Sequence, residues 1–100
     1  MTVTYQVVYW RDIPAQVKLR DGRERLARPL SDRFQEAIDA AAIRAGLAES
    51  DAYLAEWRSS DWQERQGALA DLADALIAEL ESGYPDDRLT ALVARGGREG

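Results

Sequence analysis

Apolar and polar residues alternate over the first ten positions of the chain in the pattern of a half-buried β-strand. One side of an extended segment 2–10 is apolar and carries Val3, Tyr5, Val7 and Tyr9. The other side becomes apolar only at its end and carries Thr4, Gln6, Val8 and Trp10. Because successive side chains of a strand point to opposite faces, we expect the first side to face the core. Pro14 cannot donate to a strand ladder and is expected to mark the break after this strand.

The dipeptide Asp21-Gly22 predicts the turn of a β-hairpin, because a type I′ turn needs positive φ at both central positions. With these residues at the centre, two like-charged pairs would face each other, Arg20 with Arg23 and Lys18 with Arg25. One side of the hairpin would hold Val17, Leu19 and Leu26, and the other Lys18, Arg20, Arg23 and Arg25. Like charges directly opposite each other are unfavourable. The basic side is therefore interpreted as a solvated outer face, or as a surface for an anionic partner or ligand, unless the turn has a different register.

Helical spacing of apolar residues begins after Ser31, which can serve as the N-cap of a helix that stops at Gly46. A short second helix is expected to begin at Ser50 or Asp51 and to reach Trp57. The hydroxyl of a capping serine can accept hydrogen bonds from the amides of the first turn.

The clearest helix is predicted over residues 69–80, where apolar residues recur at helical spacing and acidic residues occupy the other faces. It ends at Gly83, and Pro85 suits the first turn of a further helix. Residues 58–67 show no helical stripe, and we favour a short edge strand around residues 62–66 over a loop.

Strands first and helices after them indicate an α+β fold class. We expect a small antiparallel sheet of three to four strands at the N-terminus, with three to four helices packed on one face. A single domain is predicted over residues 1–95, followed by a flexible C-terminal tail over residues 96–100.

The composition of the chain excludes several kinds of chemistry but does not identify an activity. The 100 residues are 46% hydrophobic and 31% charged, as in globular domains, and include neither cysteine nor histidine. This removes disulfides, thiolate chemistry and the commonest metal ligand and general base. There is no glycine-rich phosphate loop and no calcium-loop spacing. The sequence therefore predicts a protein that is not an enzyme and that binds no cofactor or metal.

Charge is distributed unevenly along the chain. Residues 1–30 contain 6 basic and 3 acidic residues, or +3, whereas the whole chain has a net charge of −5. The acidic balance disfavours nucleic acid. No apolar run reaches the ~20 residues needed to span a membrane, and the N-terminus lacks the features of a signal peptide. We therefore expect a cytoplasmic location.

Four runs of the sequence are more specific than its composition. They are YQVVYWRDIPAQV at residues 5–17, FQEAIDAAAIRAGL at 34–47, DAYLAEW at 51–57 and ALIAELESGYPDDRL near the end. Over about residues 2–93 the chain resembles the small bacterial "virulence factor" domain of conserved virulence factor C proteins. In that family the domain occurs alone or beside a scaffold-like module related to iron–sulfur assembly proteins and helical repeats. The resemblance implies no catalytic residues, and the cysteines of the larger members have no counterpart here, so it does not imply cluster binding.

These observations lead to three functional hypotheses. The first is a non-catalytic protein-interaction or accessory module that binds another bacterial protein through a basic and aromatic sheet face. Its expected contact surface is Trp10, Arg11, Lys18, Arg20, Arg23, Arg25 and Trp62. The second is a small-molecule or anion-binding accessory protein to an enzyme, which would use the same face. The third is a homodimer formed through the open edge of the strand at residues 2–10.

Overall fold

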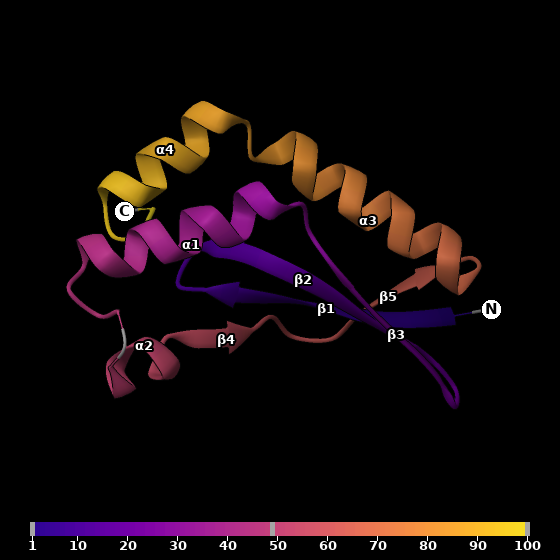
Figure 1. Cartoon of the computed structure of the whole chain (residues 1–100). Helices are drawn as coiled ribbons and strands as arrows, with labels where there is room; N and C mark the ends of the chain where they lie inside the picture. The colour runs from indigo at the N-terminus through magenta and orange to yellow at the C-terminus, as the bar shows by residue number, and fades with distance from the viewer. Residues whose placement is uncertain (1, 49, 100) are drawn as a thin grey trace.

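A computed structural model describes residues 2–48 and 50–99. Three long antiparallel strands, β1 (Thr2–Trp10), β2 (Ile13–Asp21) and β3 (Glu24–Pro29), form most of the sheet. Two short strands, β4 (Trp57–Ser59) and β5 (Gln63–Gln66), pair with the other side of β1 (Figure 1). This antiparallel sheet, with the helices that follow, confirms the predicted α+β class, and β5 confirms the strand favoured within residues 58–67.

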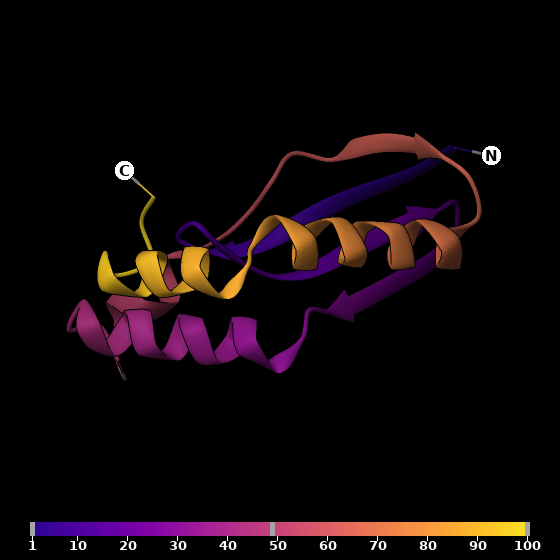
Figure 2. The ribbon, with the colours of Figure 1, turned by 90° about the horizontal axis from the view of Figure 1, so that it is seen from above.

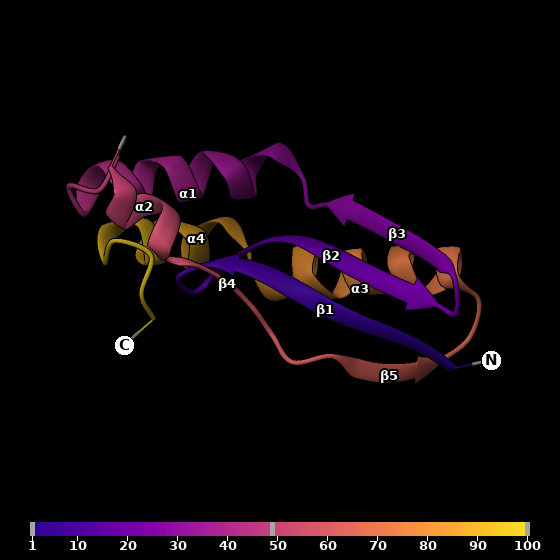
Figure 3. The ribbon, with the colours of Figure 1, turned by 90° about the horizontal axis from the view of Figure 1, so that it is seen from below.

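Three helices cover one face of the sheet. They are α1 (Asp32–Arg44), α3 (Leu69–Gly83) and α4 (Asp86–Ala94). Figure 2 shows α3 lying over the strands, with α1 and α4 side by side toward the end of the sheet that holds the β1–β2 turn. The short helix α2 (Asp51–Ala55) lies at the end of the sheet beside β4. We call the opposite side the outer face, and Figure 3 shows the strands of β1, β2 and β3 there with no helix in front of them.

The core has two parts, one under each half of the helix layer. Beneath α3, buried residues of β1 and β2 such as Val3, Val17 and Leu19 pack on Ala73 and Leu76. At the other end of the sheet, α1 and α4 enclose the second cluster. It comprises Trp10, Ile13, Leu30, Phe34, Ala37, Ile38, Ala41, Ala42, Leu89 and Leu92. The apolar stripes predicted for these helices therefore face the sheet or one another.

Both predicted N-cap positions are occupied as expected, but only one serine caps its helix with its own side chain. The Ser50 Oγ accepts a hydrogen bond from the Tyr53 N–H of α2. The Ser31 hydroxyl makes no side-chain cap bond and instead donates to Glu81 Oε1 at 2.9 Å. Glu81 Oε2 also accepts from the Ser31 N–H at 2.8 Å. A carboxylate from α3 therefore anchors the start of α1.

The β2–β3 hairpin has a different register from the predicted one. Asp21 pairs with Glu24, so the turn is centred on Gly22 and Arg23. Gly22 has a φ of 62° while Arg23 has none of the positive φ that a type I′ turn requires, which fits a type II′ turn with glycine first. Lys18 consequently faces Ala27 instead of Arg25. The shift is two residues, so every side chain stays on its predicted face.

The predicted outward position of Trp10 is wrong. In β1, Val3, Tyr5 and Val7 alternate inward as expected. The pairing with β2 then shifts between Val8 and Tyr9, and past this irregularity Trp10 is buried with 0% exposure. A bulge changes which residues face the core, and sequence alternation alone does not reveal it.

The side of β1 away from β2 is not an open edge. β5 pairs with its first half and β4 with its last residues. Between them, Ser60 donates its N–H to the Val7 carbonyl at 2.9 Å and accepts from the Val7 N–H through Oγ at 2.9 Å. The homodimer proposed through this edge therefore loses its structural basis. The outer strand of the sheet on the other side is β3.

Residues 96–99 pack onto the domain, although the composition predicted a tail beyond residue 95. The Gly97 carbonyl accepts from the Asp12 N–H at 2.8 Å, and the Glu99 N–H donates to Asp12 Oδ2 at 2.7 Å. Gly97 is buried, has a φ of +93°, and a Cβ there would lie 2.8 Å from the Trp10 ring. The close approach to Trp10 requires glycine. Residue 100 lies outside the described residues.

Candidate functional site

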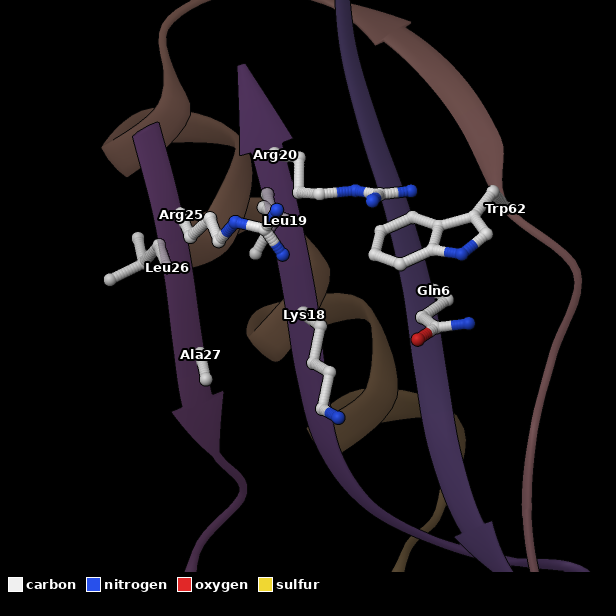
Figure 4. A pocket seen from close by; sticks show the side chains of 8 residues that line it. All are labelled: Gln6, Lys18, Leu19, Arg20, Arg25, Leu26, Ala27 and Trp62. Carbon is white, nitrogen blue, oxygen red and sulfur yellow. The ribbon is translucent and has the colours of Figure 1, made fainter. Parts of the chain in front are cut away.

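The outer face of the sheet contains a hollow of about 420 Å³. Its lining comes from β1, β2, β3 and the segment before β5, and comprises Gln6, Lys18, Leu19, Arg20, Arg25, Leu26, Ala27 and Trp62 (Figure 4). Four of the residues predicted as a contact surface, Lys18, Arg20, Arg25 and Trp62, therefore meet at one place. We refer to this site as the basic hollow.

Trp62 and Arg20 form one wall of the basic hollow. The Arg20 guanidinium carbon lies 3.8 Å from the centre of the Trp62 ring, so the two planar groups are in cation–π contact. Figure 4 shows Arg20 reaching from β2 across β1 to this ring. Trp62 is still 39% exposed, which makes it the tryptophan most available to a partner.

The segment that presents Trp62 is held by hydrogen bonds to β1. Besides the two backbone-directed bonds of Ser60 to Val7, the Gln6 Nε2 donates to the Ser60 carbonyl at 3.1 Å. Gln6 also lines the basic hollow. Sequence reasoning missed both Gln6 and Ser60. The polar side of β1 gave a weak signal for Gln6, and no local pattern marks Ser60 as a bridge.

The cations of the hairpin differ from the other arginines in how they are bonded. The side chains of Lys18, Arg20, Arg23 and Arg25 donate no hydrogen bond to any described residue, although their backbones take part in the hairpin. In contrast, every other described arginine donates to a carboxylate or a backbone carbonyl, namely Arg11, Arg28, Arg33, Arg44, Arg58, Arg65, Arg88, Arg95 and Arg98. The positive charge of the basic hollow is therefore left uncompensated by the folded domain.

Like charges also face each other within the basic hollow. Arg20 pairs with Arg25 across β2 and β3, an arrangement that is unfavourable unless solvent or an anion intervenes. Arg23 lies in the exposed turn beside the hollow and does not line it. Glu64 of β5 pairs with Thr4, so it is an acidic residue on the same outer face, but it forms no ion pair with Arg20. Lys18, Arg20 and Arg25 therefore form no ion pair with any described residue.

Trp10 and Arg11 were predicted as part of the same contact surface, but the structure places both of them away from the basic hollow. Trp10 is fully buried, stacks on Tyr53 with ring centres 5.5 Å apart, and donates its indole N–H to the Tyr53 carbonyl at 2.9 Å. The Arg11 side chain is only 13% exposed, and its guanidinium donates to the Gly96 carbonyl at 2.9 Å and to Glu56 at 3.3 Å. Both side chains stabilise the opposite end of the sheet.

That end forms what we call the turn cluster, made of Arg11, Asp12, Glu56, Arg58, Arg98 and Glu99. Arg11 is the non-glycine residue with positive φ among the described residues, at 53°. Arg58 donates from Nε to the Arg11 carbonyl at 2.9 Å and pairs with Asp12 at 3.2 Å. These bonds hold the β1–β2 turn in a backbone conformation that residues other than glycine rarely adopt.

Contacts and burial outside the basic hollow shift the pKa values of four groups away from neutral pH. The hydrogen bond from Arg65 lowers the pKa of Glu79, and the same contact raises the pKa of Arg65. The hydrogen bond to Glu99 raises the pKa of Arg88. Burial raises the pKa of the Tyr84 hydroxyl. All four groups therefore keep their ordinary protonation states at neutral pH.

Within residues 2–48 and 50–99, no three acidic side chains are grouped as they would be to hold a metal ion. No helix in the same part of the chain is both long enough and apolar enough to cross a bilayer.

Comparison with known protein families identifies the family of this chain. The family described as "Virulence factor" matches residues 8–93, which is most of the sequence. The chain belongs to the virulence factor family. No curated protein and no solved structure matches it. The matched span of this virulence factor domain contains Lys18, Arg20, Arg25 and Trp62 and begins just after Gln6.

Proposed function

We propose that this virulence factor domain is a non-catalytic interaction module that binds another protein in the bacterial cytoplasm through the basic hollow. The observation that supports the proposal most strongly is the contrast in bonding. The side chains of Lys18, Arg20 and Arg25 meet around one hollow without a hydrogen-bond acceptor, although the chain is acidic and each other described arginine donates to a carboxylate or a backbone carbonyl. An oppositely charged partner surface would relieve this repulsion.

The composition of the site suits a protein partner. Arginine and tryptophan are enriched at the centres of protein interfaces, where they contribute much of the binding energy. Arg20 and Trp62 provide such a pair on a strand and an anchored loop, so little ordering is needed on binding. The uncovered outer face around them offers room for further contacts (Figure 3).

The non-catalytic part of the proposal rests on residue types. The chain contains neither histidine nor cysteine, and the Ser60 hydroxyl is engaged with backbone groups of Val7 and Asp61 rather than with a base. The basic hollow presents cations, an amide and an indole. These groups bind and orient anions, but none of them is an ordinary nucleophile or general base at neutral pH.

A second candidate function is supported by the size of the hollow. Its volume of about 420 Å³ falls within the range of small-molecule sites. Under this alternative the domain is an anion-binding accessory protein to an enzyme. It predicts a rise in melting temperature with one member of a panel of anionic metabolites.

The interaction proposal is tested by co-purification from the native host. The tagged domain, its Arg20→Glu/Arg25→Glu variant and an Arg44→Glu/Arg95→Glu control are compared, and each captured protein is identified and re-tested after purification. The control makes the same charge change at arginines outside the basic hollow. We expect a partner that is lost with the first variant and kept with the control, while both variants retain the circular dichroism of the folded domain. A partner retained equally by all three proteins would refute the proposal.

A further inference from the structure

We infer that the basic hollow recognises an extended acidic segment of its partner, with carboxylates on alternate residues. This inference rests on the proposed interaction function and specifies the chemistry of the partner. It is supported by the stacking of Arg20, the spacing of Lys18 and Arg20, and the exposure of the hollow.

The stacking of Arg20 on Trp62 prepares its guanidinium for a carboxylate. The guanidinium carbon lies 3.8 Å from the ring centre, so the contact with Trp62 is a cation–π contact that does not consume the N–H donors in hydrogen bonds. No described acceptor takes those donors. A planar guanidinium with a free edge matches the two oxygens of a carboxylate, which it can bind bidentately. The ring also restricts the motion of Arg20, so binding loses less side-chain entropy.

The spacing of the cations matches an extended chain. Lys18 and Arg20 are two residues apart on β2 and lie on the same face, so their backbone positions are separated by about 7 Å. An extended peptide places its alternate side chains on one face at the same interval. Carboxylates at alternate positions of such a segment lie within reach of the flexible Lys18 side chain and of Arg20, whose guanidinium lies across β1 beside Trp62 (Figure 4), and Arg25 pairs with Arg20 from β3.

The exposure of the lining favours a segment of a larger partner over a free anion. Lys18, Arg25, Ala27 and Trp62 are all exposed, so the hollow would bury only part of a small molecule's surface. Specific small-molecule sites typically bury 70–90% of the ligand. A segment tethered to a folded partner gains additional contacts around the hollow. Nucleic acid is disfavoured, because Glu64 lies on the same face and the chain has a net charge of −5.

The inference is tested with three blocked peptides, TETETET, TTEEETT and TQTQTQT, titrated calorimetrically into the full chain at low salt. The first two have the same composition and charge, and the third removes the charge while keeping the extended pattern. We expect TETETET to bind at least tenfold more tightly than TQTQTQT and several-fold more tightly than TTEEETT. Binding should weaken strongly at 0.5 M salt.

Two double variants locate the binding. Lys18→Gln/Arg20→Gln should reduce the affinity for TETETET at least tenfold. Arg44→Gln/Arg95→Gln, with the same change in charge, should leave it within twofold. Both variants must keep the melting temperature of the wild type within a few degrees for the comparison to count.

Each other outcome overturns a defined part of the argument. Equal binding of TETETET and TQTQTQT, or of the hollow variant and the control, refutes the acidic-segment inference. Free glutarate, inorganic phosphate or an oligonucleotide that binds as tightly as TETETET refutes the choice of ligand class. A host partner that depends on Arg20 and Arg25 while TETETET fails would refute this inference and leave the proposed function standing. A host partner that ignores both arginines refutes the proposed function itself.

Discussion

The two ends of the β1–β2 hairpin each combine arginines with a tryptophan, but the two environments are opposite. At the turn cluster, Arg11 lies beside the buried Trp10 and donates to the Gly96 carbonyl and to Glu56. In the basic hollow, the Arg20 side chain is in cation–π contact with the exposed Trp62 and donates a hydrogen bond to no described residue. The same residue types therefore hold the fold together at one end and face solvent at the other.

This difference shows how to read an arginine-rich sequence. In the local sequence, YWR at residues 9–11 and the cations of the hairpin are similar basic and aromatic features. What distinguishes them is the supply of acceptors from distant segments. The turn cluster receives Glu56 from the end of α2 and backbone carbonyls from residues 96 and 97. From the distant segments that the structure describes, the cations of the basic hollow receive the indole of Trp62 and no hydrogen-bond acceptor.

The largest expected difference in the free energy of unfolding is between alanine substitutions of Trp10 and of Trp62. Trp10→Ala should lower the free energy of unfolding by about 3–5 kcal/mol, because it removes a fully buried ring and leaves the indole acceptor at Tyr53 without its donor. Trp62→Ala should change it by less than about 1 kcal/mol, because that ring is 39% exposed. Urea denaturation of both variants measures the difference. Equal destabilisation would show that Trp62 is part of the folded core rather than a presented surface.

Sequence reasoning predicted the elements well, because helix and strand periods are local properties. The extents of α1 and α3 follow from their apolar spacing, and Ser50 resolves the uncertain start of α2. The basic side of the hairpin was also predicted, although the turn is centred one residue later. Moving the pairing by two residues exchanges partners but not faces, so the prediction of the face survived the error in register.

The remaining errors concern contacts between distant parts of the chain. The burial of Trp10 depends on the register shift in β1 and on Gly97, which lies far along the sequence and approaches the ring closely. The role of Arg11 likewise depends on residues 56 and 96. Long-range pairing of this kind is not encoded in a periodic pattern, so these two residues could not be separated from the basic hollow by sequence alone.

A smaller effect on stability is expected at Glu81, which accepts hydrogen bonds from Ser31 and Arg33 in the helix layer. Burial opposes ionisation of Glu81, but hydrogen bonds from Ser31 and Arg33 outweigh it and lower the pKa of this carboxyl. Folding lowers the pKa of Glu81, so its ionised carboxylate stabilises the folded state. This contribution to the free energy of unfolding is complete above the pKa of the unfolded chain, about 4.3, and is lost as the pH falls through the lower pKa of the folded state. Glu81→Gln should therefore lower stability by about 1–2 kcal/mol at pH 7.

The pH dependence distinguishes this role from simple loss of packing. The difference between wild type and Glu81→Gln, measured by urea denaturation, should stay constant from pH 7 to 5 and shrink below about pH 4. Glu36→Gln, at an exposed position of α1, is the matched control and should change stability little at any pH. A difference that persists unchanged at pH 3 would contradict the assigned role of the Glu81 carboxylate.

The smallest expected effects compare the two ends of the β1–β2 hairpin most directly. The same arginine-to-glutamine substitution should lower the free energy of unfolding at one end and raise it at the other. Arg58→Gln removes the donors to the Arg11 carbonyl and Asp12, and should lower stability by about 0.5–1 kcal/mol. Arg25→Gln removes one member of a like-charged pair and should raise stability by about 0.2–0.5 kcal/mol at low salt, with the gain disappearing at 0.5 M salt. Paired thermal and urea melts at both salt concentrations resolve these signs. If Arg25→Gln were as destabilising as Arg58→Gln, the hairpin cations would have acceptors in the free domain, and the positive charge of the basic hollow would not be available for a partner.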